Sequence, residues 1–254
     1  MSGAHKKQAF QIFTPAQIAS LRKGGRILHD CLKYVASLVR PGVATLELNR
    51  AAETFIRDHG AAPGFKGYRG YPATLCTSVN EVCVHGMPGK HVLQEGDIIA
   101  LDCGVLYEKL YTDACVSVPV GRVSKEAHDL LSATEEALRK GIAVVHAGAR
   151  VGDISSAIHA MLRAHGCDAV RALTGHGLGD TLHQFPDVPN FGEAGKGPVL
   201  PVHTILAIEP ISTAGSTDVV QEGDGWTIRT KDRALSAHFE HTVLVTEEGS
   251  EVLT

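Results

Sequence analysis

The sequence lacks three features that would place the chain in a specialised class of proteins. None of its six cysteines belongs to a Cys-x-x-Cys pair, no long apolar run of membrane-spanning length occurs, and acidic residues outnumber basic ones, 28 to 24. Cysteines scattered through apolar runs indicate reduced, buried thiols rather than a disulfide framework or a zinc knuckle. The net charge of −4 offers no basic footprint, so we expect no nucleic acid as a direct substrate.

A secretory signal is also missing from the beginning of the sequence. Residues 1–13 contain no apolar stretch of the roughly 7–15 residues that such a signal requires. We therefore expect a cytoplasmic protein without a membrane partner. The hydrophobic content of 44% is ample for a sizeable core, so we expect residues 1–13 to form a short N-terminal tail and residues 14–254 to form a single domain.

What the sequence does contain is an internal repeat. A shift of 106 residues lays residues 39–60 over residues 145–166 without a gap, and both segments end in Arg-x-His-Gly. A shift of 107 residues then lays Ile-Ile-Ala-Leu-Asp-Cys-Gly over Ile-Leu-Ala-Ile-Glu-Pro-Ile, so that Asp102 falls on Glu209. An internally duplicated site would contain one such carboxylate in each half.

The two halves, about 14–120 and 124–254, are each expected to begin with a pair of helices. In the first half, Thr14 and Gln17 match a capping box around a proline at the first helical position. In the second half, the long helix is expected to start at Ser124. The second helices should begin near Thr45 and Asp153 and end at Gly60 and Gly166, where glycine accepts a left-handed backbone. Because strands follow, we expect an α+β domain in which an antiparallel sheet is flanked by helices.

Four carboxylates and one imidazole lie in or beside apolar, strand-like runs. An ionised carboxylate among Ile, Leu, Ala and Val side chains needs a partner, and none of these runs supplies a lysine or arginine on the same face. A mostly oxygen donor set with one nitrogen suits two divalent ions, such as Co, Mn, Fe or Zn, which together activate a hydrolytic water. The five expected metal ligands are Asp102, Asp113, His176, Glu209 and Glu240.

Asp102 and Asp113 are close enough in the sequence to lie opposite each other on one β-hairpin. If they lie on a β-hairpin with the two-residue turn Tyr107-Glu108, Asp102 and Asp113 stand directly opposite each other. Their Cβ atoms would then be about 4.5–5.5 Å apart. Tyr-Glu has a poor composition for such a turn, so this register is a hypothesis.

Four segments of the chain, 67–89, 173–191, 207–211 and 224–246, resemble the type I methionine aminopeptidases. The resemblance extends over nearly the whole chain from Thr14, and all five expected metal ligands stand in order within matching strings. It implies the pita-bread fold of that family, an α+β domain with an internal pseudo-two-fold repeat.

The resemblance also implies a role for each metal-site residue. One ion would be held by Asp102, Asp113 and Glu240. The second would be held by Asp113, His176, Glu209 and Glu240, so that Asp113 and Glu240 bridge the pair. The resemblance further makes Glu209 the group that moves a proton from the water to the leaving amine.

Two further histidines match residues that line the cleft of the family without ligating metal. His183 would donate a hydrogen bond to the oxyanion that develops during the reaction, and His85 would contact the amide next to the scissile bond. The pocket for the methionine side chain, where aromatic and sulfur atoms suit a polarisable thioether, would be built by Tyr68, Tyr71, Cys76 and Trp226.

The chain also departs from the bacterial members of the family. Phe65 stands where cysteine is common, Leu182 where phenylalanine is common, and Gln184-Phe185 where a Glu-Glu pair is common. We expect Phe65 and Leu182 to reshape the rim of the pocket. A monovalent cation near the site, bound largely by backbone oxygens, is implied by the matching residues Asn80, Val82 and Ser236.

These observations predict a monomeric metalloaminopeptidase that removes the initiator methionine from nascent chains when the second residue is small. Its partners would be nascent N-termini, with transient ribosome contact. Two alternatives share the fold. An Xaa-Pro aminopeptidase or prolidase shares the five ligands, but it usually has an extra N-terminal domain and lacks the segment 67–89. A non-catalytic peptide-binding protein would have lost metal ligands, whereas all five are present here.

Overall fold

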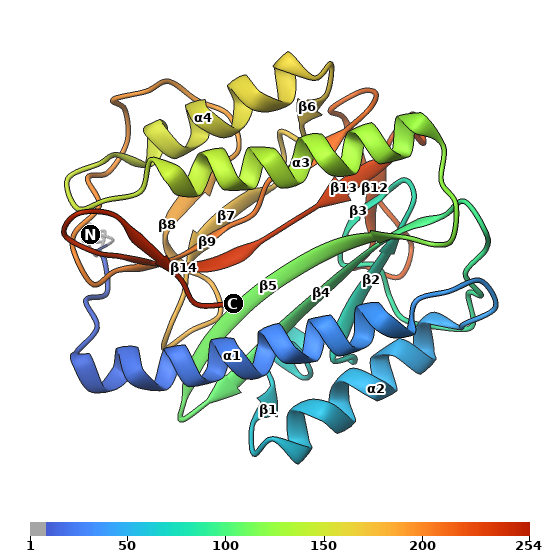
Figure 1. Cartoon of the computed structure of the whole chain (residues 1–254), viewed down its shortest axis with the longest axis horizontal. Helices are drawn as coiled ribbons and strands as arrows, with labels where there is room; N and C mark the ends of the chain where they lie inside the picture. Colours follow the sequence, from blue (N-terminus) through green and yellow to red (C-terminus); the bar gives the residue numbers. More distant parts are fainter. Residues whose placement is uncertain (1–8) are drawn as a thin grey trace, which may run out of the picture.

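The computed structural model describes residues 9–254; residues 1–8, which form most of the expected tail, lie outside the described residues. The division into a tail and a single domain stays a prediction. Figure 1 shows helices α1 and α2 along one edge of the molecule and α3 and α4 along the opposite edge, with strands β5 and β14 running between them. The helices of the described part are α1 (Pro15–Leu38), α2 (Thr45–Asp58), α3 (Lys125–Ala143) and α4 (Val151–Ala164), with a short 3-10 turn at Tyr68–Gly70.

Within residues 9–254, the strands form four antiparallel sheets. One sheet of the first half consists of β1 (Ala62–Pro63), β2 (Leu75–Val79), β4 (Ile98–Tyr107) and β5 (Leu110–Pro119). The five-stranded sheet of the second half consists of β7 (Thr174–Gly177), β8 (Gln184–Pro189), β9 (Ile205–Ile208), β14 (His241–Val245) and β15 (Ser250–Val252). Two smaller sheets contain β6 (Asp168–Ala169), β10 (Ile211–Thr213) and β13 (Ser236–His238), and β3 (Val82–Val84), β11 (Val219–Gln221) and β12 (Ile228–Thr230).

The helix starts follow local capping chemistry. The Thr14 side chain accepts from the Gln17 N–H, and the Gln17 side chain accepts from the Thr14 N–H at 3.0 Å, so the expected capping box is confirmed. Helix α3 begins after Ser124, as expected, because the Ser124 hydroxyl accepts from a backbone N–H. The start expected at Asp153 is two residues late. Asp153 instead occupies the third helical position of α4 and accepts from the N–H of the residue before the helix at 2.8 Å.

The ends of α2 and α4 are duplicated in atomic detail. Gly60 and Gly166 both have φ of 75°, and each donates its N–H to the carbonyl three residues earlier, at 3.0 and 3.2 Å. The following residue, Ala61 or Cys167, donates to the carbonyl five residues earlier, at 3.2 and 3.1 Å. This pair of bonds is a Schellman motif, for which glycine is favoured because its left-handed backbone carries no Cβ penalty.

The β4–β5 hairpin has a different register from the one expected. Its two turn residues are Glu108 and Lys109, with φ of 48° and 69°, the positive values that a type I′ turn requires. The prediction of a Tyr107-Glu108 turn was wrong, because neither pair contains the glycine or asparagine that marks such turns. Asp102 therefore pairs with Cys115, and Asp113 pairs with Gly104. The shift is two residues, so both aspartates remain on one face of the sheet, as diagonal neighbours.

The packing of the hydrophobic core explains why the sheet face that carries Asp102 and Asp113 is free to form a site. The odd-numbered residues of β4, such as Leu101, lie against α1 and α2 in one buried cluster. In the second half, Leu206 and Ile208 of β9 lie in a second cluster with α3 and α4. Since strand side chains alternate, Asp102 and Glu209 point to the other side of their sheets.

No helix within residues 9–254 is long and apolar enough to span a membrane.

The halves are joined where β5 meets β14 and the residue that precedes it. Glu240 donates its N–H to the Cys115 carbonyl at 2.9 Å and accepts from the Cys115 N–H at 3.3 Å. Close by, the Thr242 hydroxyl accepts from the Asp113 N–H at 2.8 Å and donates to the Asp113 carbonyl at 2.7 Å. The backbones of two site residues are thus held by contacts between the halves.

Candidate metal centre and adjoining pocket

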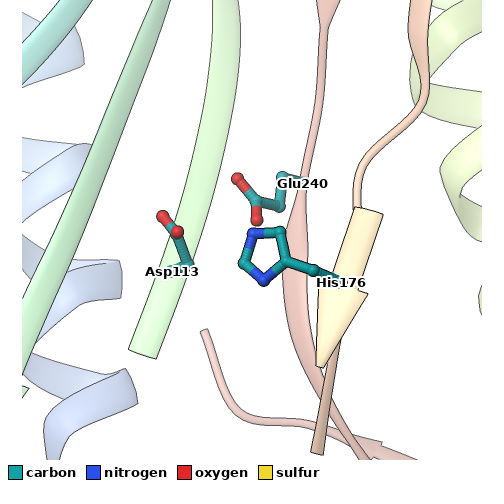
Figure 2. A group of neighbouring side chains, drawn as sticks. All are labelled: Asp113, His176 and Glu240. Atoms are coloured by element: carbon teal, nitrogen blue, oxygen red, sulfur yellow. The ribbon is translucent and has the colours of Figure 1, made fainter. Parts of the chain in front are cut away.

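The structure brings the five expected metal ligands together from three strands and from the ends of two others. Asp102 and Asp113 belong to β4 and β5, His176 to β7, while Glu209 follows β9 and Glu240 precedes β14. All five are buried, and Figure 2 shows three of them, Asp113, His176 and Glu240, gathered around one point. One donor atom from each of these three lies within 4.8 Å of the others. All five line a single cavity of about 180 Å³.

The four carboxylates have no lysine or arginine as ion-pair partner within the described residues; Glu209 and Glu240 have only histidines in that role. Burial raises the pKa of Asp102 to about 7. Burial, and then repulsion from the neighbouring acids, raises the pKa of Asp113, Glu209 and Glu240 well above the usual range. An acid in such surroundings stays protonated unless a cation compensates its charge.

Free acceptor atoms also mark this cavity. In the described part of the chain, one buried oxygen each of Asp102, Asp113 and Glu240 has no hydrogen-bond partner. Buried polar atoms are normally paired, so an unpaired group of three in one cavity needs an explanation. Divalent cations fit this donor set, because they would ionise the acids and use the free oxygens.

His176 has the hydrogen bonding of a metal ligand. Its Nδ1 lies 3.0 Å from the Gly177 carbonyl, so Nδ1–H is the donor and the Nε2 lone pair is free. Nε2 lies 3.3 Å from Glu209 Oε1. Burial lowers the pKa of His176 to about 3, which keeps the ring neutral, the form that binds metal.

His85 and His183 border the same cavity. Burial lowers the pKa of His85. Desolvation within the cleft and the Arg69 cation lower the pKa of His183 to about 4, so both rings are neutral near pH 7. His183 Nδ1 lies 3.1 Å from the Tyr68 hydroxyl, and its ring centroid is 4.2 Å from that of His176. If Tyr68 donates this bond, the Nε2–H of His183 is free to donate into the cleft.

An apolar pocket of about 150 Å³ adjoins the acidic cavity and shares Asp102, His85 and His183 with it. The rings of Tyr71 and Trp226 meet edge to face with centroids 5.1 Å apart. All eight residues expected to bind the substrate line this pocket, namely Phe65, Tyr68, Tyr71, Cys76, His85, Leu182, His183 and Trp226. Because the cavities share residues, a side chain held in the pocket would present its backbone to the acids.

The residues that depart from the pattern of the bacterial family members lie in two different places. Phe65 and Leu182 are buried in the pocket wall. Gln184 and Phe185 instead face the segment before α1: the Gln184 amide donates to the Gln11 side chain at 2.8 Å, and Phe185 meets the ring of Phe10 with centroids 4.9 Å apart. The residues expected around a monovalent cation are close together, since Ser236 donates its N–H to the Asn80 carbonyl at 2.9 Å and Val82 begins the adjacent β3.

Two ionisable residues that border these cavities were not predicted from the sequence. His238 lies among the acids, with Nε2 3.7 Å from Glu209 Oε2 and 3.8 Å from Glu240 Oε2. The signal that could have revealed it is its spacing, because a residue two places before Glu240 on a strand points to the same side. Arg69 borders the apolar pocket, and no periodic pattern marked it.

The chain matches the model of metallopeptidase family M24 over residues 19–247. It is 46% identical to a methionine aminopeptidase of Clostridium perfringens, over 94% of this chain and 96% of the relative. It is 42% identical to methionine aminopeptidase 1 of Bacillus subtilis, over 95% of this chain and 97% of the relative.

Among solved structures, the chain is likewise similar to methionine aminopeptidases. The methionine aminopeptidase of Thermotoga maritima superimposes with a TM-score of 0.96 at 39% identity, covering 97% of this chain and 99% of that one. The pita-bread fold is thereby confirmed. A prolidase of Pyrococcus furiosus superimposes with a TM-score of 0.76 at 20% identity, covering 96% of this chain but 65% of that one, so this second likeness concerns the fold alone.

Proposed function

The chain belongs to metallopeptidase family M24, and from that premise we propose how its residues remove an N-terminal methionine. Methionine aminopeptidase activity follows from relatives that match the chain over nearly their whole length. The Xaa-Pro alternative is less favoured, since prolidases share the fold at low identity. A non-catalytic binding protein would have no use for buried acids that need cations.

One observation carries the proposal: buried acids without a basic partner share a wall with an apolar pocket. We assign one divalent ion to Asp102, Asp113 and Glu240, and a second to Asp113, His176, Glu209 and Glu240. When bound, such ions supply an acidified water and polarise the scissile carbonyl. The apolar pocket would take the methionine side chain, because its aromatic rings and the Cys76 thiol suit a thioether.

The remaining roles belong to protein groups. Glu209, whose pKa is raised by burial and by neighbouring acids, would accept a proton from the water and pass it to the leaving amine. His183, held by Tyr68 at 3.1 Å, would donate Nε2–H to the oxyanion, and His85 would hold the amide beside the scissile bond. The sequence reasoning adds a cytoplasmic, monomeric setting, with nascent N-termini as substrates and transient ribosome contact.

The test uses metal-free protein restored with Co²⁺, Mn²⁺, Fe²⁺ or Zn²⁺ separately. Each form is offered Met-Gly, Met-Leu and Ala-Pro peptides, and released amino acids are quantified. We expect methionine release with at least one ion, and faster release from Met-Gly than from Met-Leu. Absence of release with every ion, or faster cleavage of Ala-Pro, would overturn the proposal. Asp113→Asn, which keeps the side-chain volume, is the matched inactive control.

A further inference from the structure

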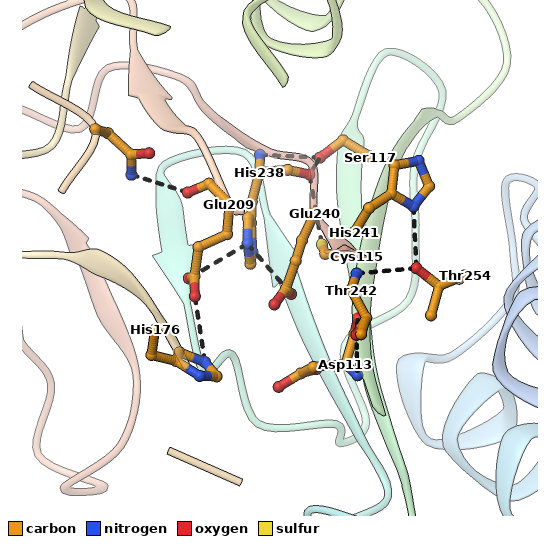
Figure 3. A network of polar contacts seen from close by, with 11 residues as sticks. Asp113, Cys115, Ser117, His176, Glu209, His238, Glu240, His241, Thr242 and Thr254 are labelled. Carbon is orange, nitrogen blue, oxygen red and sulfur yellow. Dashed lines mark hydrogen bonds and ion pairs between the residues drawn. The ribbon is translucent and has the colours of Figure 1, made fainter. Parts of the chain in front are cut away.

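His238 is the histidine of the acidic cavity to which the proposed function gives no role. It ends β13 and is 2% exposed. Within the described residues, both of its ring nitrogens are buried without a hydrogen-bond partner. Figure 3 shows the ring between the Glu209 and Glu240 side chains. A buried polar group aimed into a cavity without a partner indicates an interaction that forms when the cavity is filled.

The internal repeat gives this position a counterpart in the first half. Asp113 pairs with Gly104 on β4. The shift of 107 residues that lays Asp102 over Glu209 lays Gly104 over Ile211, and Ile211 pairs with His238. His238 therefore occupies in the second half the place that Asp113 occupies in the first. The fold has supplied two equivalent positions facing the site, and a histidine fills the second.

Its hydrogen bonding differs from that of His176, the ring proposed as a ligand. His176 places Nδ1–H on the Gly177 carbonyl at 3.0 Å and so frees Nε2 for metal. The Nδ1 of His238 has no acceptor in the described part of the chain, and a buried N–H without an acceptor is rarer than a bare acceptor nitrogen. The favoured tautomer of His238 is therefore Nε2–H, which directs its single donor toward the two carboxylates.

We propose that His238 is a positioning residue that donates Nε2–H to Glu209 and Glu240 and fixes the orientation in which their other oxygens hold the ions. This inference rests on the metal ligands proposed above. The separations of 3.7 and 3.8 Å exceed a hydrogen bond, so each bond requires its carboxylate to rotate toward Nε2. Ligating carboxylates are themselves usually hydrogen-bonded, and loss of such a partner weakens metal binding. A ligand role is disfavoured, because no acceptor holds Nδ1.

Three variants separate donation from packing. Glutamine places its amide nitrogen where histidine has Nε2, so His238→Gln keeps the donor, whereas His238→Leu removes it at similar volume. His241→Leu is the matched control: this half-buried histidine follows Glu240 but points away from the acids, with Nδ1 3.1 Å from the Thr254 hydroxyl. Figure 3 shows these opposite directions of His238 and His241.

Metal-free wild type and variants are titrated with Co²⁺ by calorimetry, and the visible spectrum of the Co²⁺-loaded proteins is recorded. We expect His238→Leu to weaken Co²⁺ binding by about 10–100-fold and to alter the Co²⁺ spectrum. His238→Gln should restore most of the affinity, and His241→Leu should match wild type. Thermal unfolding of the metal-free proteins identifies any general loss of stability.

The outcomes are distinct. Wild-type affinity in His238→Leu would overturn the inference while leaving the proposed function intact. If His238→Gln and His238→Leu weakened Co²⁺ binding equally, the donor role would be overturned. Direct ligation of the ion by His238, or packing of its ring, would then explain the loss. If the wild type bound no Co²⁺, the metal ligands of the proposed function would fail, and the inference would fail with them.

Discussion

The two halves of the molecule share one scaffold but build their parts of the site differently. In the first half, β4 and β5 run unbroken for 10 residues each. In the second half, the matching strand is divided into β9 and β10 at Glu209 and Pro210, and the partner strand into β13 and β14 around Glu240. Proline has no N–H for a ladder. The duplicated core therefore tolerates interruption where the longer glutamates reach the site.

The largest effect is expected where the halves share an ion. Asp113→Asn keeps the shape of the side chain but removes a charge assigned to both ions, so we expect methionine release to fall by about a thousandfold or more. Steady-state assays at saturating metal would measure this. Activity within tenfold of wild type would mean that the first half contributes less to the site than the second.

The second prediction concerns pH and tests the acids of both halves together. Their folded-state pKa values are raised, Asp102 to about 7, whereas burial lowers the pKa of His176 to about 3 and that of His183 to about 4. Below about pH 6.5 these opposite shifts offset each other, but above it the histidines are neutral in both states and the raised acids alone differ. The stability of metal-free protein should therefore fall as pH rises from about 6.5 to 8, by on the order of a few kcal/mol. Metal-loaded protein should not show this loss. Thermal unfolding across pH, with and without a chelator, would detect it, and parallel curves would contradict the assignment.

The third prediction uses a position that the halves fill differently. A Cβ on Gly104 would lie 2.7 Å from the Phe65 ring, whereas the matching Ile211 has a full side chain. We expect Gly104→Ala to push Phe65 into the methionine pocket, raise KM for methionine peptides by about tenfold, and destabilise the fold by about 1–3 kcal/mol. Gly104→Ala with Phe65→Ala should recover KM. An unchanged KM in the single variant would show that Phe65 has room to move.

The smallest effects should be equal in the two halves. Gly60 and Gly166 have the same φ of 75° and open space around them, so alanine at either position adds only left-handed strain, about 1 kcal/mol. Gly223→Ala is a control at an open position without positive φ. Denaturant unfolding measures each. Unequal losses of stability at Gly60 and Gly166 would show that the two helix ends are not equivalent.

Some elements could be predicted from the sequence because their causes are local. The capping box at Thr14 and the glycine ends of α2 and α4 depend on residues within one turn of the helix. The hairpin register was wrong because Glu108 and Lys109 take positive φ without a residue type that announces it. The proposed metal ligands were predicted from charges in apolar strands, from the repeat and from a family resemblance. His238 was not, because its meaning depends on strand pairing with Ile211, which no local pattern reveals.

The contacts between Cys115 and Glu240, and between Asp113 and Thr242, also govern how the chain acquires activity. They join residues 125 to 129 positions apart in the sequence, so they form only after both halves have been synthesised and folded. Each half can bury its own helices, yet neither alone holds the complete set of proposed metal ligands. Catalysis is therefore a late property of the maturing chain, and the enzyme cannot cleave any peptide before its own second half is in place.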